Sequence, residues 1–183
     1  MRKSIVLLLV GLLALVLSAC GEDDSEAKKV DSDNDAEQQE DSDDNNGEEE
    51  EQKEFSAGDN IEKDGVITTV TNVERSNGTE FEDPDDGNDF AIVNIKIENE
   101  SDDEVSYNPF DYSLKNSKGQ IKDSGMSMVD QDNQLDSGKL VPDGKVEGSV
   151  VFQAPEDDDN GDLTLLIEDD WLSEDKIKVN LGE

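Results

Sequence analysis

The sequence predicts an all-β protein: an immunoglobulin-like, antiparallel β-sandwich of about seven strands that follows a signal peptide and a disordered acidic tether. Three observations carry this prediction. An apolar run near the N-terminus ends at the only cysteine, and the residues after that cysteine are strongly acidic. From Phe55 onward, apolar residues recur with a period of two, and pairs of turn-forming residues separate the runs.

Residues 1–19 have the features of a bacterial signal peptide. Arg2 and Lys3 precede a mainly apolar segment from Ile5 to Ala19, whose fifteen residues fall short of the roughly 20 that a spanning helix needs. Residues Leu17 to Cys20 resemble the lipobox of bacterial lipoproteins. The resemblance implies removal of residues 1–19 and a diacylglyceryl thioether on Cys20. An ordinary cleavage site, or a short membrane anchor with a chance cysteine, is the alternative.

Lipid attachment at Cys20 has consequences for the rest of the chain. Two acyl chains suffice for stable anchoring, so the sequence predicts a lipid-anchored protein at the cell membrane, facing the extracytoplasmic side. The lipid bilayer is then a partner through acylated Cys20. Because Cys20 is the only cysteine, the mature chain would keep no thiol for disulfides, thiolate catalysis or metal ligation.

Residues 20–54 are expected to be a disordered acidic linker. Residues 21–54 hold 17 acidic residues and three lysines, with almost no large apolar side chain. Such a segment cannot bury enough apolar surface to offset its ordering entropy, and like charges extend it. A spacer is the main interpretation. A cation-collecting tail is the alternative, because Asp31, Asp33 and Asp35 alternate, although Ala36 and Ser42 replace the glycine and glutamate of a calcium loop.

Residues 55–183 have the length of one domain with a single core. Their acidic surface should repel nucleic acid and anionic lipid headgroups, so we expect no nucleic-acid partner. With a net charge of −35 for the whole chain, the composition also favours a halophilic or salt-tolerant source over a merely acidic exported protein.

The strands follow from the alternation of apolar residues. It is clearest in Ala91–Ile97 and blurred in Val66–Val73, where we expect a bulge or burial on both faces. Turn pairs such as Asp64-Gly65 separate the runs. The stretch Ser124–Lys139 is a long connection that either folds on a partner or crosses one end of the sandwich. The seven expected strands are 66–73, 91–97, 105–107, 112–114, 146–153, 163–167 and 177–181.

Several motifs occur in a familiar order. They are Phe55–Asp59, Asp86–Phe90, Glu98–Asp102, Asn108–Leu114, Leu140–Gly144 and Gly148–Phe152. In this order they resemble the family of bacterial lipoprotein domains called domain of unknown function 4352, also known as telomeric-repeat-binding-factor-2-like. The resemblance covers roughly residues 55–183. It implies an extracytoplasmic immunoglobulin-like sandwich and brings no catalytic residues with it.

The composition excludes most catalytic machinery. The chain has no histidine, which removes the Ser-His-Asp triad and the commonest zinc ligands, and it has no glycine-rich phosphate-binding motif. Carboxylate pairs remain, but they arise by chance in so acidic a domain. We therefore expect no enzyme activity and no catalytic residues.

Two acidic loops are candidate calcium sites. Calcium takes six to eight oxygen ligands, which clustered acids between strands can supply. Neither loop matches a full calcium motif, so a solvated acidic surface is the alternative. The sequence suggests no cofactor other than calcium. The candidate ligands are Glu82, Asp83, Asp85, Asp86 and Asp89 in the first loop, and Asp157, Asp158, Asp159 and Asp162 in the second.

Three aromatic residues are candidates for a partner surface. Phe110 and Tyr112 flank Asp111 after a proline, and Trp171, the only tryptophan, follows a pair of acids. Aromatic side chains are enriched at binding hot spots, although in a small sandwich they also plug the ends of the core. Together these observations predict a non-enzymatic interaction module for an envelope or secreted protein. The alternative is a calcium- or solute-binding domain that uses the acidic loops.

Overall fold

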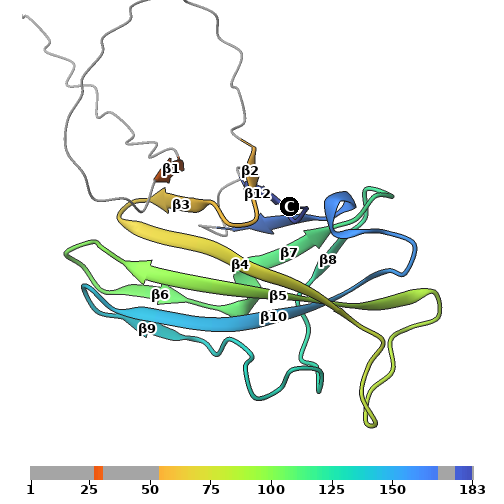
Figure 1. Ribbon diagram of the computed structural model, residues 1–183. Coiled ribbons are helices and arrows are strands. Elements are labelled where there is room, and N and C mark those ends of the chain that lie inside the picture. Colours follow the sequence, from red (N-terminus) through yellow and green to blue (C-terminus); the bar gives the residue numbers. More distant parts are fainter. Residues whose placement is uncertain (1–26, 31–53, 169–175, 183) are drawn as a thin grey trace, which may run out of the picture.

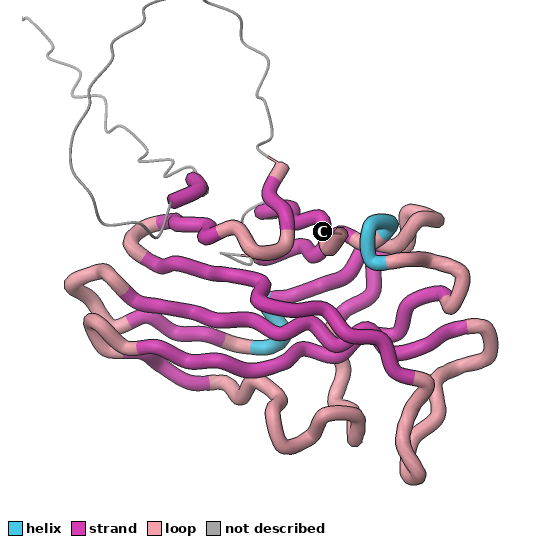
Figure 2. The backbone as a smooth tube through the Cα atoms, viewed as in Figure 1, coloured by secondary structure: helices cyan, strands magenta, loops and turns pink. Residues whose placement is uncertain are grey.

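The computed structural model describes residues 27–30, 54–168 and 176–182, and these form a β-sandwich. Figures 1 and 2 show strands throughout the described chain and helix only in two short turns. Sheet A has the order β1 (Lys28–Val30), β3 (Asn60–Lys63), β4 (Val66–Ser76), β5 (Asn88–Asn99) and β10 (Lys145–Pro155). Sheet B has the order β2 (Phe55–Ser56), β12 (Ile177–Asn180), β11 (Thr164–Ile167), β7 (Tyr112–Lys115) and β8 (Ile121–Asp123). A third sheet pairs β6 (Val105–Tyr107) with β9 (Gly138–Leu140), and the two 3₁₀ turns are η1 (Pro109–Asp111) and η2 (Asn160–Asp162).

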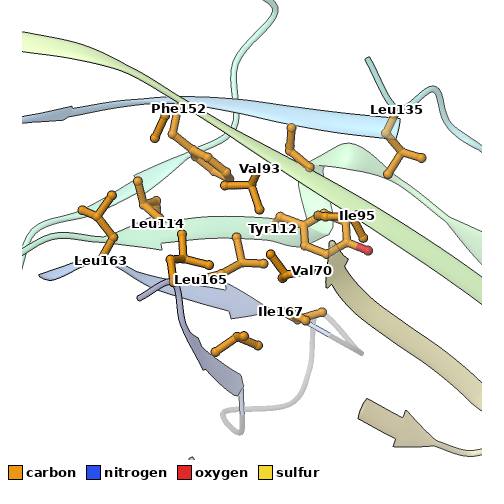
Figure 3. Packing of buried hydrophobic residues seen from close by; sticks show 14 of the residues in the cluster. Val70, Val93, Ile95, Tyr112, Leu114, Leu135, Phe152, Leu163, Leu165 and Ile167 are labelled. Atoms are coloured by element: carbon orange, nitrogen blue, oxygen red, sulfur yellow. The ribbon is translucent and has the colours of Figure 1, made fainter. Parts of the chain in front are cut away.

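The main core lies between sheets A and B (Figure 3). Alternate residues of β5, from Ala91 to Ile97, point into it, as the period of two requires. Their polar neighbours Asn94 and Lys96 lie on the other face and are partly exposed. Side chains from both sheets fill the core, including Val70, Val93, Ile95, Tyr112, Leu114, Phe152, Leu163 and Leu165.

The blurred alternation in β4 has a structural cause. A bulge between Val70 and Asn72 shifts the register against β5, so that Val70 and Val73 both pack against the core. After the bulge, Arg75 pairs with Ala91 in register and forms an ion pair with Asp89. An extra residue that changes which side chains face inward is the usual consequence of a bulge.

The β3–β4 hairpin confirms its predicted turn. Asp64 and Gly65 have φ values of 53° and 77°, which is the left-handed backbone that a two-residue type I′ turn requires at both positions. A Cβ atom on Gly65 would lie 2.9 Å from the Cβ atom of Ser101, so any side chain at this position would also clash with Ser101.

The segment between β8 and β9 packs against sheet A. Val129 joins Phe90, Ile92 and Val151 in a second buried cluster, made by the β5 and β10 residues that point away from the main core. Further along, Leu135 turns into the main core beside Gly148, where a Cβ atom would lie 2.7 Å from the Leu135 Cα atom. The long connection is therefore an ordered part of the domain.

The same segment covers the edge of β10. The Leu135 N–H donates to the Ser149 carbonyl at 2.9 Å, and the Ser149 N–H donates to the Asn133 carbonyl at 2.8 Å. Strand β1 lies along the opposite edge of sheet A, on β3. The connection thus covers β10 around Ser149, and the short strand β1 covers β3, which limits the strand edge open to other chains.

All seven expected strands are present, within a few residues of their expected bounds. Five further strands are not anticipated by the alternation, because each has only two to four residues. One of them, β1, corrects the expectation of a linker that is disordered throughout residues 20–54, since Lys28–Val30 pair with β3. Cys20, the predicted signal peptide and most of the predicted linker lie outside the described residues. Among the described residues, no helix is long and apolar enough to cross a membrane.

Candidate functional site

One carboxylate joins the two longest loops of the domain. Glu82 lies in the β4–β5 loop, and its Oε2 atom accepts hydrogen bonds from the Ser127 hydroxyl at 2.6 Å and from the Met128 N–H at 2.5 Å. Ser127 and Met128 belong to the segment between β8 and β9. Figure 1 shows both loops extending from the same side of the sandwich. Glu82 therefore acts as a clamp between segments about 45 residues apart in the chain.

Each loop is also fixed from within. On the first loop, the Glu82 N–H donates to the Thr79 hydroxyl at 3.2 Å. Gly78 has a φ of 105°, and a Cβ atom there would lie 2.4 Å from the Glu82 carbonyl oxygen. On the second loop, the Gln134 amide donates to the carbonyls of Ser127 and Val129 at 2.7 and 2.9 Å. The clamp thus joins two preformed turns.

Large apolar side chains are exposed on the clamped loops. Phe81 is 74% exposed, Met126 94% and Met128 57%. We call these three residues the loop surface. Ile121 on the neighbouring strand β8 is exposed too. Exposed apolar side chains that share one site are typical of interaction surfaces, whereas single ones are ordinary.

A groove of about 260 Å³ runs beside the loop surface. Met126 lies at its side, and the nearly fully buried residues Phe90, Val151 and Phe152 lie beneath it. Acidic residues dominate its charged lining, which consists of Glu82, Asp85, Lys122 and Asp123. The groove therefore has a mainly acidic lining beside the exposed Met126 side chain.

The first predicted calcium loop uses its carboxylates in other ways. Glu82 accepts the hydrogen bonds that join the two loops. Asp89 forms an ion pair with Arg75, so a guanidinium group of the protein lies where a bound calcium ion was predicted. Asp83, Asp85 and Asp86 are exposed.

In the second predicted calcium loop, the carboxylates hold the backbone in place. Asp158 accepts hydrogen bonds from the Ser117 N–H at 3.0 Å and the Ser117 hydroxyl at 2.7 Å. Partial burial raises the Asp158 pKa, but these hydrogen bonds outweigh it, so the pKa lies below its usual value. Asp159 and Asp162 cap η2 reciprocally, and Asp157 is exposed. Within the described ranges, no group of three or more acids could hold a metal ion.

The predicted aromatic surface is partly wrong. Phe110 is exposed on η1, where the Asn108 side chain accepts its N–H at 3.0 Å. Tyr112 is buried in the main core instead, because it lies on the same inward face of β7 as Leu114. Its burial, together with the nearby Asp111, raises the pKa of the Tyr112 hydroxyl well above its usual value. Trp171 lies outside the described residues.

A second groove of about 530 Å³ lies elsewhere on the sandwich. It is bounded by the β4 bulge at Thr71 and Asn72 and by the η2 turn at Asn160 and Gly161. The Asn160 side-chain oxygen is buried there without a hydrogen-bond partner among the described residues. Of the residues that the structure describes, Asp159 is the only charged one that lines this groove.

Comparison with known proteins identifies the domain. The family model described as "Domain of unknown function (DUF4352)" matches residues 55–177. The chain belongs to this family. No curated protein matches the chain.

Solved structures that resemble the DUF4352 domain come from bacteria. The crystal structure of the yjhA protein from Bacillus subtilis has a TM-score of 0.57 at 20% identity, covering 70% of this chain and 99% of that one. A protein described as a "putative lipoprotein (ycdA)" from Bacillus subtilis has a TM-score of 0.49 at 16% identity, covering 64% and 36%. An uncharacterized beta-sandwich protein from Clostridium difficile 630 has a TM-score of 0.47 at 15% identity, covering 76% and 100%. The first of these supports the β-sandwich fold.

Sequence reasoning did not select the loop surface of this DUF4352 domain. Met126 and Met128 lie in the long connection, and two methionines in a polar stretch are a usable signal. Phe81 is an isolated aromatic residue among acids, which is a weaker one. The clamp at Glu82 has no signal in the sequence, because its partners lie far along the chain.

Proposed function

We propose that this protein is a lipoprotein of the bacterial envelope, anchored in the cell membrane through acylated Cys20, and that its DUF4352 domain is a non-enzymatic interaction module on the extracytoplasmic side. The lipobox at residues 17–20 supports the anchoring. The loop surface of Phe81, Met126 and Met128 carries the interaction part.

The clamped loops favour binding for an energetic reason. The connections to Glu82 fix the backbone that presents the apolar side chains, so less conformational entropy remains to be lost when a partner binds. Each Å² of apolar surface covered contributes about 25 cal/mol. Methionine adapts to irregular partner surfaces because its side chain is unbranched and polarizable.

The groove beside the loop surface defines the kind of partner. Its lining by Glu82, Asp85 and Asp123 fits a protein segment in which apolar side chains are flanked by Lys or Arg. The net charge of −35 attracts such a segment over longer distances and weakens association as salt rises. An exported or envelope protein with an exposed basic segment meets these requirements, and nucleic acid does not.

Site-specific crosslinking in intact cells tests the interaction. A photoreactive residue at Met126 should give a discrete protein adduct, and the same residue at the exposed turn position Lys118 should not. Combining the Met126 probe with Phe81→Ser and Met128→Ser should weaken the adduct at least several-fold, while thermal unfolding confirms that the domain is intact. Equal adducts from both positions, or an adduct insensitive to these substitutions, would refute the proposed surface.

Anchoring has a separate test. Cells grown with a clickable fatty acid should label the wild-type protein, and Cys20→Ser should abolish the label and move the protein from the membrane fraction into the medium. A wild-type protein that carries no fatty acid would overturn the anchoring part and leave the interaction surface untouched.

A further inference from the structure

Strand β1 belongs to the linker, yet it is paired with the domain. It runs antiparallel to β3, with Lys28 opposite Glu62, Lys29 opposite Ile61 and Val30 opposite Asn60 (Figure 1). The Lys28 ammonium lies 2.8 Å from the Glu62 carboxylate. The Lys29 ammonium lies 2.6 Å from the carboxylate of Asp59. Two adjacent lysines therefore contact two carboxylates of the sheet edge.

The domain holds these carboxylates in place by its own contacts. Glu62 also accepts the Gly65 N–H at 3.0 Å, and Asp59 accepts the Ser56 N–H at 3.1 Å. Both acidic side chains are only 17% and 18% exposed, whereas Lys28 and Lys29 are 62% and 56% exposed. The two acceptor carboxylates are thus also bound by the sandwich itself, whereas the two lysines that contact them remain largely exposed.

The sequence makes β1 the one stretch of the linker that fits this acceptor. Lys28 and Lys29 are the only basic residues between positions 21 and 52, and acids surround them on both sides. No other stretch of residues 21–52 could bring two cations to Asp59 and Glu62, and acidic side chains facing these carboxylates would destabilise a strand pair. Ala27 adds an apolar contact with the main core.

We propose that the β3 edge is a strand-binding site for a Lys-Lys segment, that residues 28–30 of the same chain occupy it, and that this occupancy sets how far the domain stands from Cys20. The last part rests on the lipid attachment proposed above. When β1 is bound, seven residues separate Cys20 from Lys28, and these eight steps along the chain reach at most about 29 Å. When β1 is released, the link runs to Phe55, and its reach extends to about 120 Å.

Ionic strength should determine how much of the protein has β1 bound to β3. Three paired residues and two ion pairs with half-exposed lysines hold β1, and such pairs weaken as salt screens them. The screening length falls from about 10 Å at 0.1 M salt to about 3 Å at 1 M. The domain should therefore stand close to the membrane at low salt and extend away from it at high salt.

Distance measurement on the unlipidated mature chain, residues 20–183, tests the binding step. With the only native cysteine removed by Cys20→Ser, one spin label can be placed on β1 at Val30→Cys and a second at Lys118→Cys in the exposed β7–β8 turn. At 0.05 M salt we expect a narrow distance distribution. The double variant Lys28→Gln and Lys29→Gln, or 1 M NaCl, should reduce this narrow population at least threefold in favour of a broad, longer one. Lys53→Gln, which removes a lysine outside β1, is the matched control and should leave the distribution unchanged.

Two results would overturn the proposal. One is a broad distribution for the wild-type chain at low salt, and the other is a narrow distribution that survives the double variant. Because the measurement uses unlipidated protein, it is independent of anchoring. A failure of fatty-acid labelling at Cys20 would remove only the consequence for reach from the membrane, and the strand-binding site would remain.

Discussion

Replacing Glu82 with alanine should release the second loop from the first. The substitution removes both hydrogen bonds that the Glu82 carboxylate accepts from Ser127 and Met128. Hydrogen bonds to a charged acceptor contribute about 1.5–3 kcal/mol each, but Glu82 is partly exposed, which reduces each of these two bonds to about 1 kcal/mol, or about 2 kcal/mol in total. Val129 stays buried against sheet A, so the loop should loosen without global unfolding.

Amide hydrogen exchange followed by NMR measures this local opening. A loss of about 2 kcal/mol corresponds to about 30-fold faster exchange, which we expect at the amides of Met128 and Val129, with the β5 and β10 core amides unchanged. Asp86→Ala removes an exposed acid from the same loop and is the matched control. If exchange at Met128 in Glu82→Ala stays within threefold of the wild type, Glu82 is no clamp, and the argument for a preformed loop surface fails.

Three further predictions concern stability. Asn99 is buried, and its side-chain amide donates to the carbonyls of Asp103 and Leu140 at 2.8 and 3.1 Å. Its side-chain oxygen accepts from the Ser101 N–H and hydroxyl. Asn99→Ala should therefore lower the free energy of unfolding, measured with urea, by about 2–4 kcal/mol. The exposed control Asn72→Ala should change the unfolding free energy by less than about 0.5 kcal/mol, and an equally small effect of Asn99→Ala would contradict this account. Lys145 and Lys96 hold the Glu98 pKa below its usual value, so the ionised Glu98 stabilises the fold above about pH 4.5, and this stability is lost as the pH falls. In Glu98→Gln, the free energy of unfolding should therefore fall less steeply as the pH is lowered below 4.5. An unchanged pH dependence would show that the ion pairs of Glu98 contribute no stability. Calcium, magnesium and sodium chloride at matched ionic strength should shift the thermal midpoint equally, because Asp158, Asp159 and Asp162 already accept hydrogen bonds from the protein; a shift selective for calcium would revive the calcium site.

Local patterns predicted the architecture because they act over a few residues. The alternation in Ala91–Ile97 specifies one buried face whatever the strand pairs with, and Asp64-Gly65 specifies a hairpin because few residues tolerate positive φ. The blurred stretch Val66–Val73 predicted a bulge or burial on both faces, and the structure has a bulge there. These signals need no knowledge of the rest of the chain.

The position of Tyr112 shows where such reasoning stops. An aromatic residue beside a proline is compatible with an exposed hot spot or with the core, and only the pairing of β7 with β11 decides that Tyr112 points inward. The burial of Val129 and Leu135 likewise depends on the surface that sheet A offers to the long connection.

The sequence by itself therefore determined that a signal-like segment and an acidic linker precede a β-sandwich, and which residues of the long strands face its core. The tertiary structure alone decided which acids have partners: Glu82 holds a distant loop, Asp89 pairs with Arg75, and Asp59 and Glu62 bind the linker's lysines. The physical reason is that the chain carries 50 carboxylates of two nearly identical kinds. Their partners lie many residues away, so the fold brings them together and no local pattern distinguishes one acid from the next.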